Sequence, residues 1–153
     1  MFMTLKDANQ STQAGSGNQQ LNAALESLFQ SALDAAAKSY SPYSGFKVGA
    51  ALKLNNGEII TGTNVENVSF GLTICAERSA LVQAVSRFGP AVRVEAVAVA
   101  NLSNTSCPPC GACRQFLAEF INPEAPVLFP SSTGVRVMPF SQVLPLAHDL
   151  KLK

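Results

Sequence analysis

The most constraining feature of this sequence is the run VEAVAVAN at residues 94–101, which is almost wholly apolar. A strand with one solvated face alternates apolar and polar residues, so this run predicts a strand that is buried on both faces. The layer rules of domain architecture then favour helices packed against a mixed sheet. We therefore predict one α/β domain around this strand, and 153 residues are enough to enclose a real core.

The rest of the chain alternates between helical and strand periodicity. In FKVGAALKL apolar residues alternate with lysines, and the turn signal NNG joins this segment to a returning strand. The predicted helices show apolar residues at helical spacing instead. In chain order we predict a helix over about 20–39, strands over 46–54 and 58–64, a helix over 75–88, the strand 94–101, a helix over roughly 110–121, strands over 125–130 and 134–140, and a short helix over 141–147.

The low charge content of the chain argues against some classes of binding partner. Only 14% of the residues are charged and the net charge is +1. A protein that binds a nucleic-acid backbone normally presents a basic surface, so polynucleotide binding is disfavoured. No run approaches 18 apolar residues, and no transmembrane helix is expected. We expect neither nucleic acid nor a membrane as a partner.

The N-terminal segment is polar and rich in Gln, Ser, Gly and Asn, and we expect a mobile tail over residues 1–18. It has neither the basic start nor the apolar core of a signal peptide, so the expected compartment is the cytoplasm. Thiols stay reduced there, and disulfides are rare. The four cysteines are then metal ligands, nucleophiles or core residues; they are Cys75, Cys107, Cys110 and Cys113.

Three of these cysteines stand at the predicted starts of helices. Cys110 and Cys113 form a C-x-x-C whose members are neighbours on a helix surface, and Cys75 begins another helix. The partial positive charge of a helix N-terminus favours thiolate over thiol. If the two N-termini meet, three sulfurs share one centre with a fourth position open to water, as in a catalytic zinc site. Glu77 would then supply the carboxylate that proton transfer needs.

Other interpretations of these residues stay open. A structural four-cysteine zinc site would include Cys107, although two prolines force extended backbone between Cys107 and Cys110. A thioredoxin-like redox motif would need no third cysteine on another helix. A free cysteine is most often a small core residue, and Glu77 could simply complement a helix dipole. A structural zinc site, however, has no use for that glutamate.

The motifs YSPYSGFKVGAAL, TNVENVSFGLTICAER and PCGACRQFLAEF, in this order over about residues 40–120, resemble the small cytidine deaminases of pyrimidine salvage. The pairing of C-A-E with P-C-x-x-C is similar to the signature of zinc-dependent nucleobase deaminases in their three-cysteine form. The resemblance implies one Zn²⁺ per chain on Cys75, Cys110 and Cys113. It also implies that Glu77 lies beside the water activated by the metal and carries protons to the pyrimidine.

The resemblance implies a set of substrate contacts as well. Phe46 would stack on the pyrimidine ring, a residue that the strand pattern alone would assign to the core. Asn64 and Glu66 would hydrogen-bond the ribose hydroxyls, and the backbone N–H of Ala76 would donate to the cytosine carbonyl. Arg78 would hydrogen-bond the zinc thiolates and offset the formal charge of −1 that three thiolates leave on Zn²⁺.

Two further positions concern assembly, because the resemblance implies a homotetramer. Phe70 occupies a place where relatives often carry tyrosine. His148, the only histidine, occupies the place of a phenylalanine that in tetrameric relatives reaches into a neighbouring subunit's active site. Both are candidates for inter-subunit contacts, and the plain alternative for His148 is an exposed residue with no role. Arg114, next to Cys113, is interpreted as an ordinary solvent-facing helix residue.

We therefore predict a three-layer α/β/α sandwich with a mixed central sheet over residues 19–153. Its predicted activity is the zinc-dependent hydrolytic deamination of cytidine and 2′-deoxycytidine to uridine and 2′-deoxyuridine with release of ammonia. One alternative is deamination of a modified cytosine nucleoside such as blasticidin S, and a polynucleotide deaminase is less favoured. A non-catalytic zinc protein is the alternative from a different class.

Overall fold

The computed structural model describes residues 16–148 of the chain. Residues 1–15 of the expected N-terminal tail and the last five residues, 149–153, lie outside the described residues. Helix α1 (Ser16–Ala36) begins inside the segment 1–18, earlier than the helical periodicity predicts, and it also ends three residues earlier than predicted. Among the described residues, no helix is both long and apolar enough to cross a membrane.

A five-stranded mixed sheet forms the centre of the domain, in the order β2-β1-β3-β4-β5. Strand β3 pairs antiparallel with β1 and parallel with β4, while the two edge pairs, β1–β2 and β4–β5, are antiparallel. The strands are β1 (Val48–Leu54), β2 (Ile59–Thr63), β3 (Val94–Asn101), β4 (Pro126–Ser131) and β5 (Gly134–Pro139). Strand β3 covers the predicted 94–101, and all of its residues except Glu95 are buried.

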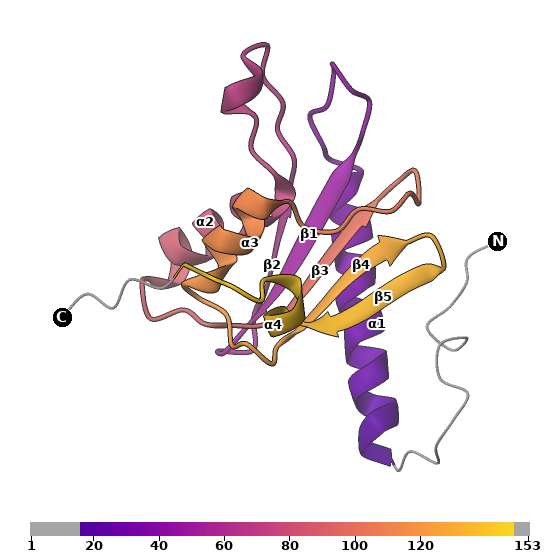
Figure 1. Cartoon of the computed structure of the whole chain (residues 1–153), viewed down its shortest axis with the longest axis vertical. Coiled ribbons are helices and arrows are strands. Elements are labelled where there is room, and N and C mark those ends of the chain that lie inside the picture. Colours follow the sequence, from indigo (N-terminus) through magenta and orange to yellow (C-terminus); the bar gives the residue numbers. More distant parts are fainter. Residues whose placement is uncertain (1–15, 149–153) are drawn as a thin grey trace.

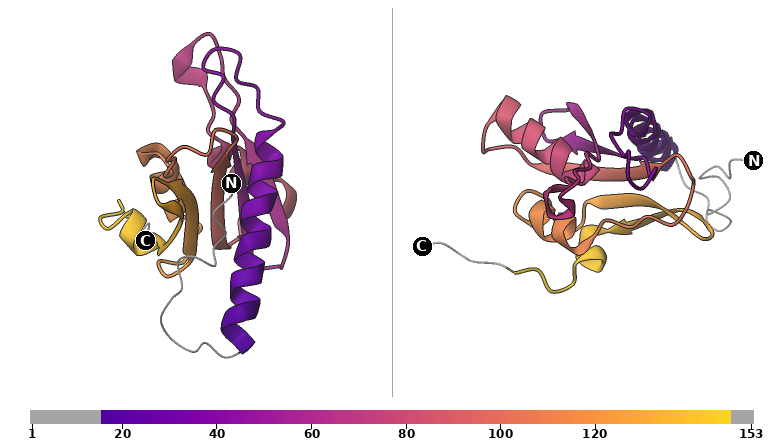
Figure 2. Two further views of the ribbon diagram at one scale, coloured as in Figure 1. Left: turned by 90° about the vertical axis from the view of Figure 1, so that its right-hand side faces the viewer. Right: turned by 90° about the horizontal axis from the view of Figure 1, so that it is seen from above.

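Helices cover both faces of this sheet, which confirms the predicted α/β sandwich (Figure 2). Because successive side chains of a strand point to opposite faces, the apolar residues divide into two clusters. Ala51, Ala98 and Leu128 pack under α1, whereas Leu52 and Val97 belong to the cluster on the other face. That second cluster includes residues of α2 (Ala76–Phe88) and α3 (Gly111–Ala118), which lie side by side in Figure 1.

Two glycines let a helix approach the sheet closely, one on each face. A Cβ on Gly49 would lie 2.0 Å from the carbonyl oxygen of Ala32 in α1. On the other face, a Cβ on Gly62 would lie 2.5 Å from the carbonyl oxygen of Ala76 and 2.4 Å from the backbone nitrogen of Ala80. Only glycine leaves room for such contacts. Gly62 therefore sets the depth at which the N-terminal turn of α2 meets β2.

Several boundaries differ from the predicted ones. Strand β1 begins at Val48, two residues after the predicted start, because residues 46 and 47 belong to a loop. Helix α3 ends at Ala118, and the last helix, α4 (Phe140–Val143), is a single turn. The order of helices and strands otherwise follows the prediction.

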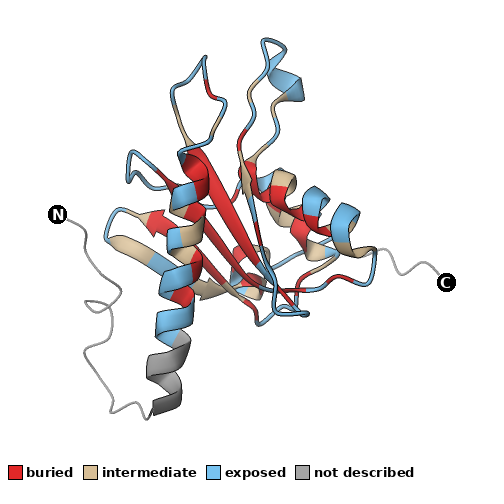
Figure 3. Ribbon diagram, turned by 180° about the vertical axis from the view of Figure 1, so that it is seen from behind, coloured by how far each residue is buried: buried red, intermediate tan, exposed pale blue. Residues whose placement is uncertain are grey.

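Two loops project together beyond the same end of the sheet (Figure 1). We call residues 37–47 the first loop and residues 64–74 the second loop; the second loop contains the short 3-10 helix η2 (Phe70–Leu72). The backbone joins them, because the Tyr40 N–H donates to the Asn64 carbonyl at 3.2 Å and the Glu66 N–H donates to the Tyr40 carbonyl at 2.8 Å. Most of their residues are exposed, whereas strands β1 and β3 are mostly buried (Figure 3).

Candidate active site

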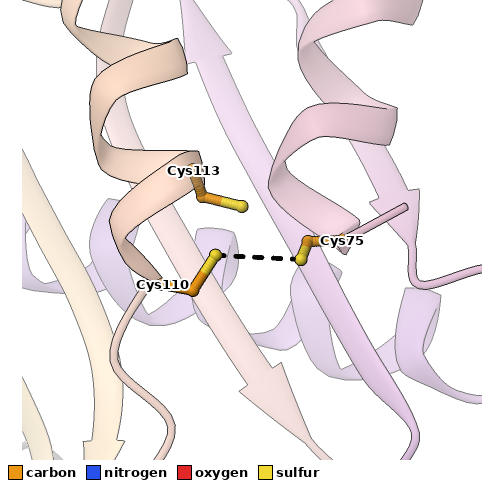
Figure 4. A group of neighbouring side chains, drawn as sticks. All are labelled: Cys75, Cys110 and Cys113. Carbon is orange, nitrogen blue, oxygen red and sulfur yellow. Dashed lines mark hydrogen bonds between the residues drawn. The ribbon is translucent and has the colours of Figure 1, made fainter. Parts of the chain in front are cut away.

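The structure brings three cysteine sulfurs to one point between α2 and α3. Cys75 is the N-cap residue of α2, Cys110 is the N-cap residue of α3, and Cys113 lies in the first turn of α3. The three sulfur atoms all lie within 4.8 Å of one another, and the sulfurs of Cys75 and Cys110 are 3.9 Å apart (Figure 4). The two helix N-termini therefore meet, which is the condition that a shared metal centre requires.

The spacing of these sulfurs suits a tetrahedral metal ion. A zinc–sulfur distance of about 2.3 Å with tetrahedral angles places ligand sulfurs roughly 3.8 Å apart. Three thiolates in contact repel one another, and a divalent cation relieves that repulsion. Cys113 is buried while Cys110 is exposed, so the cluster is open on one side. The donor set fits zinc with three protein ligands and one further coordination position.

Positive charge and hydrogen bonds favour the thiolate form of Cys75. Hydrogen bonds from the Cys113 thiol and from Arg78 lower the pKa of the Cys75 thiol to about 5. The Nη2 atom of Arg78 lies 3.7 Å from the Cys75 sulfur and also donates to the Thr73 carbonyl at 3.1 Å. The pKa of Cys113 is raised, because its thiol donates to Cys75 and because it is buried. Arg78 thus lies against the sulfur of Cys75.

Glu77 is a buried carboxyl group beside this cluster. Only 4% of the residue is exposed, although it stands in the first turn of α2, where a helix-capping glutamate would face solvent. Burial raises the pKa of Glu77, and the charge of Cys75 adds to the increase. Cys113 and Arg78 are among its neighbours. A carboxyl group in this place can exchange protons with a molecule bound next to the sulfurs.

Cys107 lies apart from the cluster. Among residues 16–148, the group of potential metal ligands contains Cys75, Cys110 and Cys113 only. Cys107 is half-buried against the core cluster under α2 and α3, and its N–H donates to the Pro130 carbonyl at 3.0 Å. Burial raises the pKa of its thiol to about 11. This placement gives no support to a structural site with four sulfur ligands.

Asn64 is buried and holds the first loop in place. Its Oδ1 atom accepts from the Ser39 hydroxyl at 2.5 Å and from the Val48 N–H at 2.9 Å. Its Nδ2 atom donates to the Phe46 carbonyl at 2.9 Å. Phe46 itself is half-buried and packs against the core cluster under α2 and α3. The side chain of Asn64 therefore fixes the backbone of the residue that is predicted to stack on the pyrimidine.

Glu66 receives several hydrogen bonds from the first loop. Its Oε2 atom accepts from the N–H groups of Tyr43 at 2.9 Å and Ser44 at 3.2 Å, and its Oε1 atom accepts from the Ser44 hydroxyl. The bond from the Ser44 hydroxyl is the largest cause that lowers the pKa of Glu66, and the two backbone N–H groups add to it. Glu66 is therefore held as a carboxylate at the base of the loop pair.

Of the three remaining predicted residues, Ala76 adjoins the cysteine cluster, whereas Phe70 and His148 are exposed elsewhere on the domain. Ala76 is fully buried as the first residue of α2, next to Cys75. Phe70 is 77% exposed in η2 and makes an edge contact with the Tyr43 ring, with centroids 6.2 Å apart. His148 is exposed after α4, and its backbone exchanges two hydrogen bonds with the side-chain amide of Gln115, at 3.0 and 3.2 Å.

In this region the structure corrects one sequence-based interpretation, that of Arg114, and adds one residue that the sequence does not single out, Ser44. Arg114 is not solvent-facing: its guanidinium group is partly buried and donates to the carbonyls of Pro109 at 2.7 Å and Val143 at 3.2 Å. Its position directly after Cys113 was the only signal in the sequence. Ser44 carries no signal of its own, because a serine between tyrosine and glycine is also what an ordinary turn contains.

Comparisons with known proteins agree with this geometry. Residues 22–128 match the family model described as the cytidine and deoxycytidylate deaminase zinc-binding region. A cytidine deaminase of Halalkalibacterium halodurans is 42% identical over 121 residues, which are 77% of this chain and 89% of that protein. One from Mycobacterium tuberculosis is 43% identical over 119 residues, 78% of this chain and 85% of that protein. The crystal structure of cytidine deaminase from Burkholderia pseudomallei superimposes with a TM-score of 0.72 at 41% identity, covering 80% of this chain and 97% of that one.

Proposed function

Because the chain belongs to the cytidine deaminase family, we infer that it catalyses the zinc-dependent hydrolytic deamination of cytidine to uridine and ammonia. The observation that carries this conclusion is the cluster of three cysteine sulfurs within 4.8 Å of one another, with the buried carboxyl group of Glu77 beside it. A non-catalytic zinc protein would not need a buried carboxyl group at such a centre. Nothing in the site favours a modified cytosine nucleoside over cytidine.

The roles that we propose for the residues at the cysteine cluster follow from where their side chains lie. Cys75, Cys110 and Cys113 would hold the zinc ion, which would supply Lewis acidity and make a water molecule nucleophilic at neutral pH. Glu77 would accept one proton from the attacking water and pass it to ring nitrogen N3 as the water oxygen adds to C4 of the base. It would then move the proton of the new C4 hydroxyl group to the amino group, which leaves as ammonia. Arg78 donates to the Cys75 sulfur and draws negative charge away from the cluster.

The base is held by a main-chain group and an aromatic ring in this proposal. The N–H of Ala76 belongs to the first turn of α2, where backbone donors have no partner within the helix, so it is available to the carbonyl oxygen of the pyrimidine. Phe46 stacks on the ring, supported from behind by the core cluster and along its backbone by Asn64.

Unused hydrogen-bonding capacity supports the proposed role of Asn64 and Glu66 at the sugar. An amide oxygen accepts two hydrogen bonds and an amide nitrogen donates two; Asn64 uses both acceptor positions and one donor within the protein. A carboxylate has about four acceptor positions, of which Glu66 uses three. One donor and one acceptor are left, the complement of a single hydroxyl group. A sugar that lacks one of its two ring hydroxyls can still satisfy them, which supports 2′-deoxycytidine as a second substrate.

We also propose a cytoplasmic homotetramer that acts in pyrimidine salvage. The family resemblance supports this proposal, and the surface supports the assembly alone. The second loop and the neighbouring face of α2 expose large apolar side chains, namely Val65, Val68, Phe70, Leu72, Ile74 and Val82. An exposed apolar surface of this kind is typical of a subunit contact. His148 stays a candidate for an inter-subunit contact. Sedimentation equilibrium would give the assembly, and a monomeric mass would contradict it.

Ultraviolet absorbance of the purified protein mixed with single substrates tests the activity. We expect the absorbance change of cytosine-to-uracil conversion with cytidine and 2′-deoxycytidine, and much less with free cytosine, which lacks the sugar. Cytidine monophosphate serves as a further comparison. Removal of zinc with a chelator should abolish the change and zinc should restore it. No conversion of any nucleoside by the zinc-loaded protein would contradict the proposal.

A further inference from the structure

The hydroxyl group of Ser44 connects two residues that the proposed function places on opposite ends of the nucleoside. Its oxygen accepts a hydrogen bond from the Phe46 N–H at 2.9 Å. Its proton is then directed to the other partner, the Oε1 atom of Glu66. Phe46 is the proposed stacking residue for the base, and Glu66 the proposed acceptor for the sugar. One hydroxyl group therefore joins the base end of the site to the sugar end.

The backbone of the same residue completes the contact with Glu66. The Ser44 N–H donates to Oε2 at 3.2 Å, beside the Tyr43 N–H at 2.9 Å. Both carboxylate oxygens are thus held by the first loop, although Glu66 lies 22 residues away from Ser44 in the chain. Hydrogen bonds in a row strengthen one another, and bonds to a charged acceptor are the stronger ones.

An unattached glutamate in this position would be free to move. Ser44 is exposed and Glu66 is only partly buried, so packing alone does not select one orientation of the carboxylate. Fixing a mobile side chain when a ligand binds costs affinity, and a side chain that is already fixed avoids this loss. The one acceptor position of Glu66 that remains unused must also point toward the substrate. Its three hydrogen bonds to the first loop determine that direction.

We propose that Ser44 is a positioning residue for the sugar end of the substrate. It acts by holding the Glu66 carboxylate at a fixed position relative to Phe46. This inference rests on the proposed function, since it gives Ser44 a role only if a nucleoside binds there. Ser44 touches neither the reacting atoms nor the cysteine cluster. Its loss should therefore weaken nucleoside binding while the rate of the chemical step stays nearly unchanged.

The variant Ser44→Ala tests this role, with Ser44→Thr as the variant that keeps a hydroxyl group. Steady-state kinetics with cytidine should show KM raised about tenfold and kcat changed less than about threefold, the size expected for a lost bond to a charged group. Ser44→Thr should recover most of the lost affinity. Ser27→Ala removes a serine hydroxyl from the exposed face of α1 and serves as the matched control, with unchanged kinetics.

A double-mutant cycle separates positioning from a general effect on folding. The dissociation constant of the product uridine is measured by calorimetry for the wild type, Ser44→Ala, Glu66→Ala and the double variant. If Ser44 acts through Glu66, the double variant binds uridine no more weakly than Glu66→Ala alone. Additive losses, or an unchanged KM in Ser44→Ala, would overturn the inference while an active wild type leaves the proposed function standing. A wild type inactive on all cytosine nucleosides would overturn both.

Discussion

The cysteine cluster and the loop pair are parts of one site, but the protein builds them differently. The cluster stands on the ends of two helices whose bodies are anchored in the core: Ala76 and Ala80 are fully buried, and Leu117 is 1% exposed. The loop pair projects past the sheet and is held by hydrogen bonds between side chains and backbone, most of them to Asn64 or Glu66. Packing fixes the first part and polar contacts fix the second.

This structural difference corresponds to two functions within the site, metal binding by the cysteine cluster and sugar recognition by the loop pair. Metal ligands must be held to within about half an ångström, which helices packed on a sheet can achieve. Recognition of a sugar needs fewer fixed distances, and loops on a rigid scaffold are the usual carriers of such specificity. Changes in the cluster should therefore abolish metal binding or turnover, whereas changes in the loop pair should alter affinity and leave the chemistry in place.

The largest expected effect is that of Cys113→Ala. Removing this buried sulfur leaves two ligands, so we expect the protein to lose stoichiometric zinc and all measurable turnover of cytidine. Cys107→Ala is the matched control, because this cysteine lies outside the cluster. Atomic spectroscopy after dialysis measures the zinc content per chain of the two variants, and we expect only Cys107→Ala to retain it. If Cys107→Ala lost zinc as completely, the centre would have four sulfur ligands and the catalytic assignment would fail.

A smaller but still large effect is expected for Glu77→Gln. The amide has nearly the same shape as the carboxyl group but cannot carry the proton, so kcat should fall by roughly 10²–10⁴-fold. Zinc content and the dissociation constant of uridine should stay close to those of the wild type, since the cluster and the loop pair are untouched. Near-normal turnover with zinc retained would show that another group transfers the protons.

The cluster and the central sheet could be predicted from the sequence because both depend on local patterns. The apolar run 94–101 indicates β3 without knowledge of the rest of the fold, and its ends are the observed ones. Likewise, a helix start at Cys75 and a C-x-x-C at another helix start place each sulfur at a helix N-terminus. These signals depend on spacing over a few residues, where hydrophobic periodicity and helix geometry are reliable. That the two N-termini meet is implied by the family resemblance rather than by the spacing.

The polar contacts of the loops and of Arg114 could not be predicted in the same way. The acceptors of Arg114 are carbonyls of Pro109 and Val143, and one of them lies 29 residues away in the chain. Ser44 meets Glu66 only because the backbone joins the two loops. In both cases the partner comes from the tertiary fold, and a polar residue in a loop or on a helix surface carries no pattern that identifies it.

The smallest expected effect is a pH-dependent contribution of Glu66 to stability, which tests whether polar contacts hold the loop pair. The Ser44 hydroxyl bond and the two backbone N–H groups keep the pKa of Glu66 below its ordinary value of 4.5. A folded-state pKa below the unfolded one means that the stabilisation is full above about pH 4.5 and is lost as pH falls through the lower, folded-state value.

Thermal unfolding of the wild type and of Glu66→Gln, from about pH 7 to about pH 3, measures this contribution. The wild type should unfold at the higher temperature near neutrality, and the difference should shrink on acidification below about pH 4.5. Both proteins carry the same cysteines, so any loss of metal at low pH affects them alike and largely cancels in the difference. In a Ser44→Ala background the difference near neutrality should be smaller, because the largest cause of the lowered pKa is gone. A difference that grows on acidification would mean that Glu66 is not held as a carboxylate, and the loop pair would then depend on packing as the cysteine cluster does.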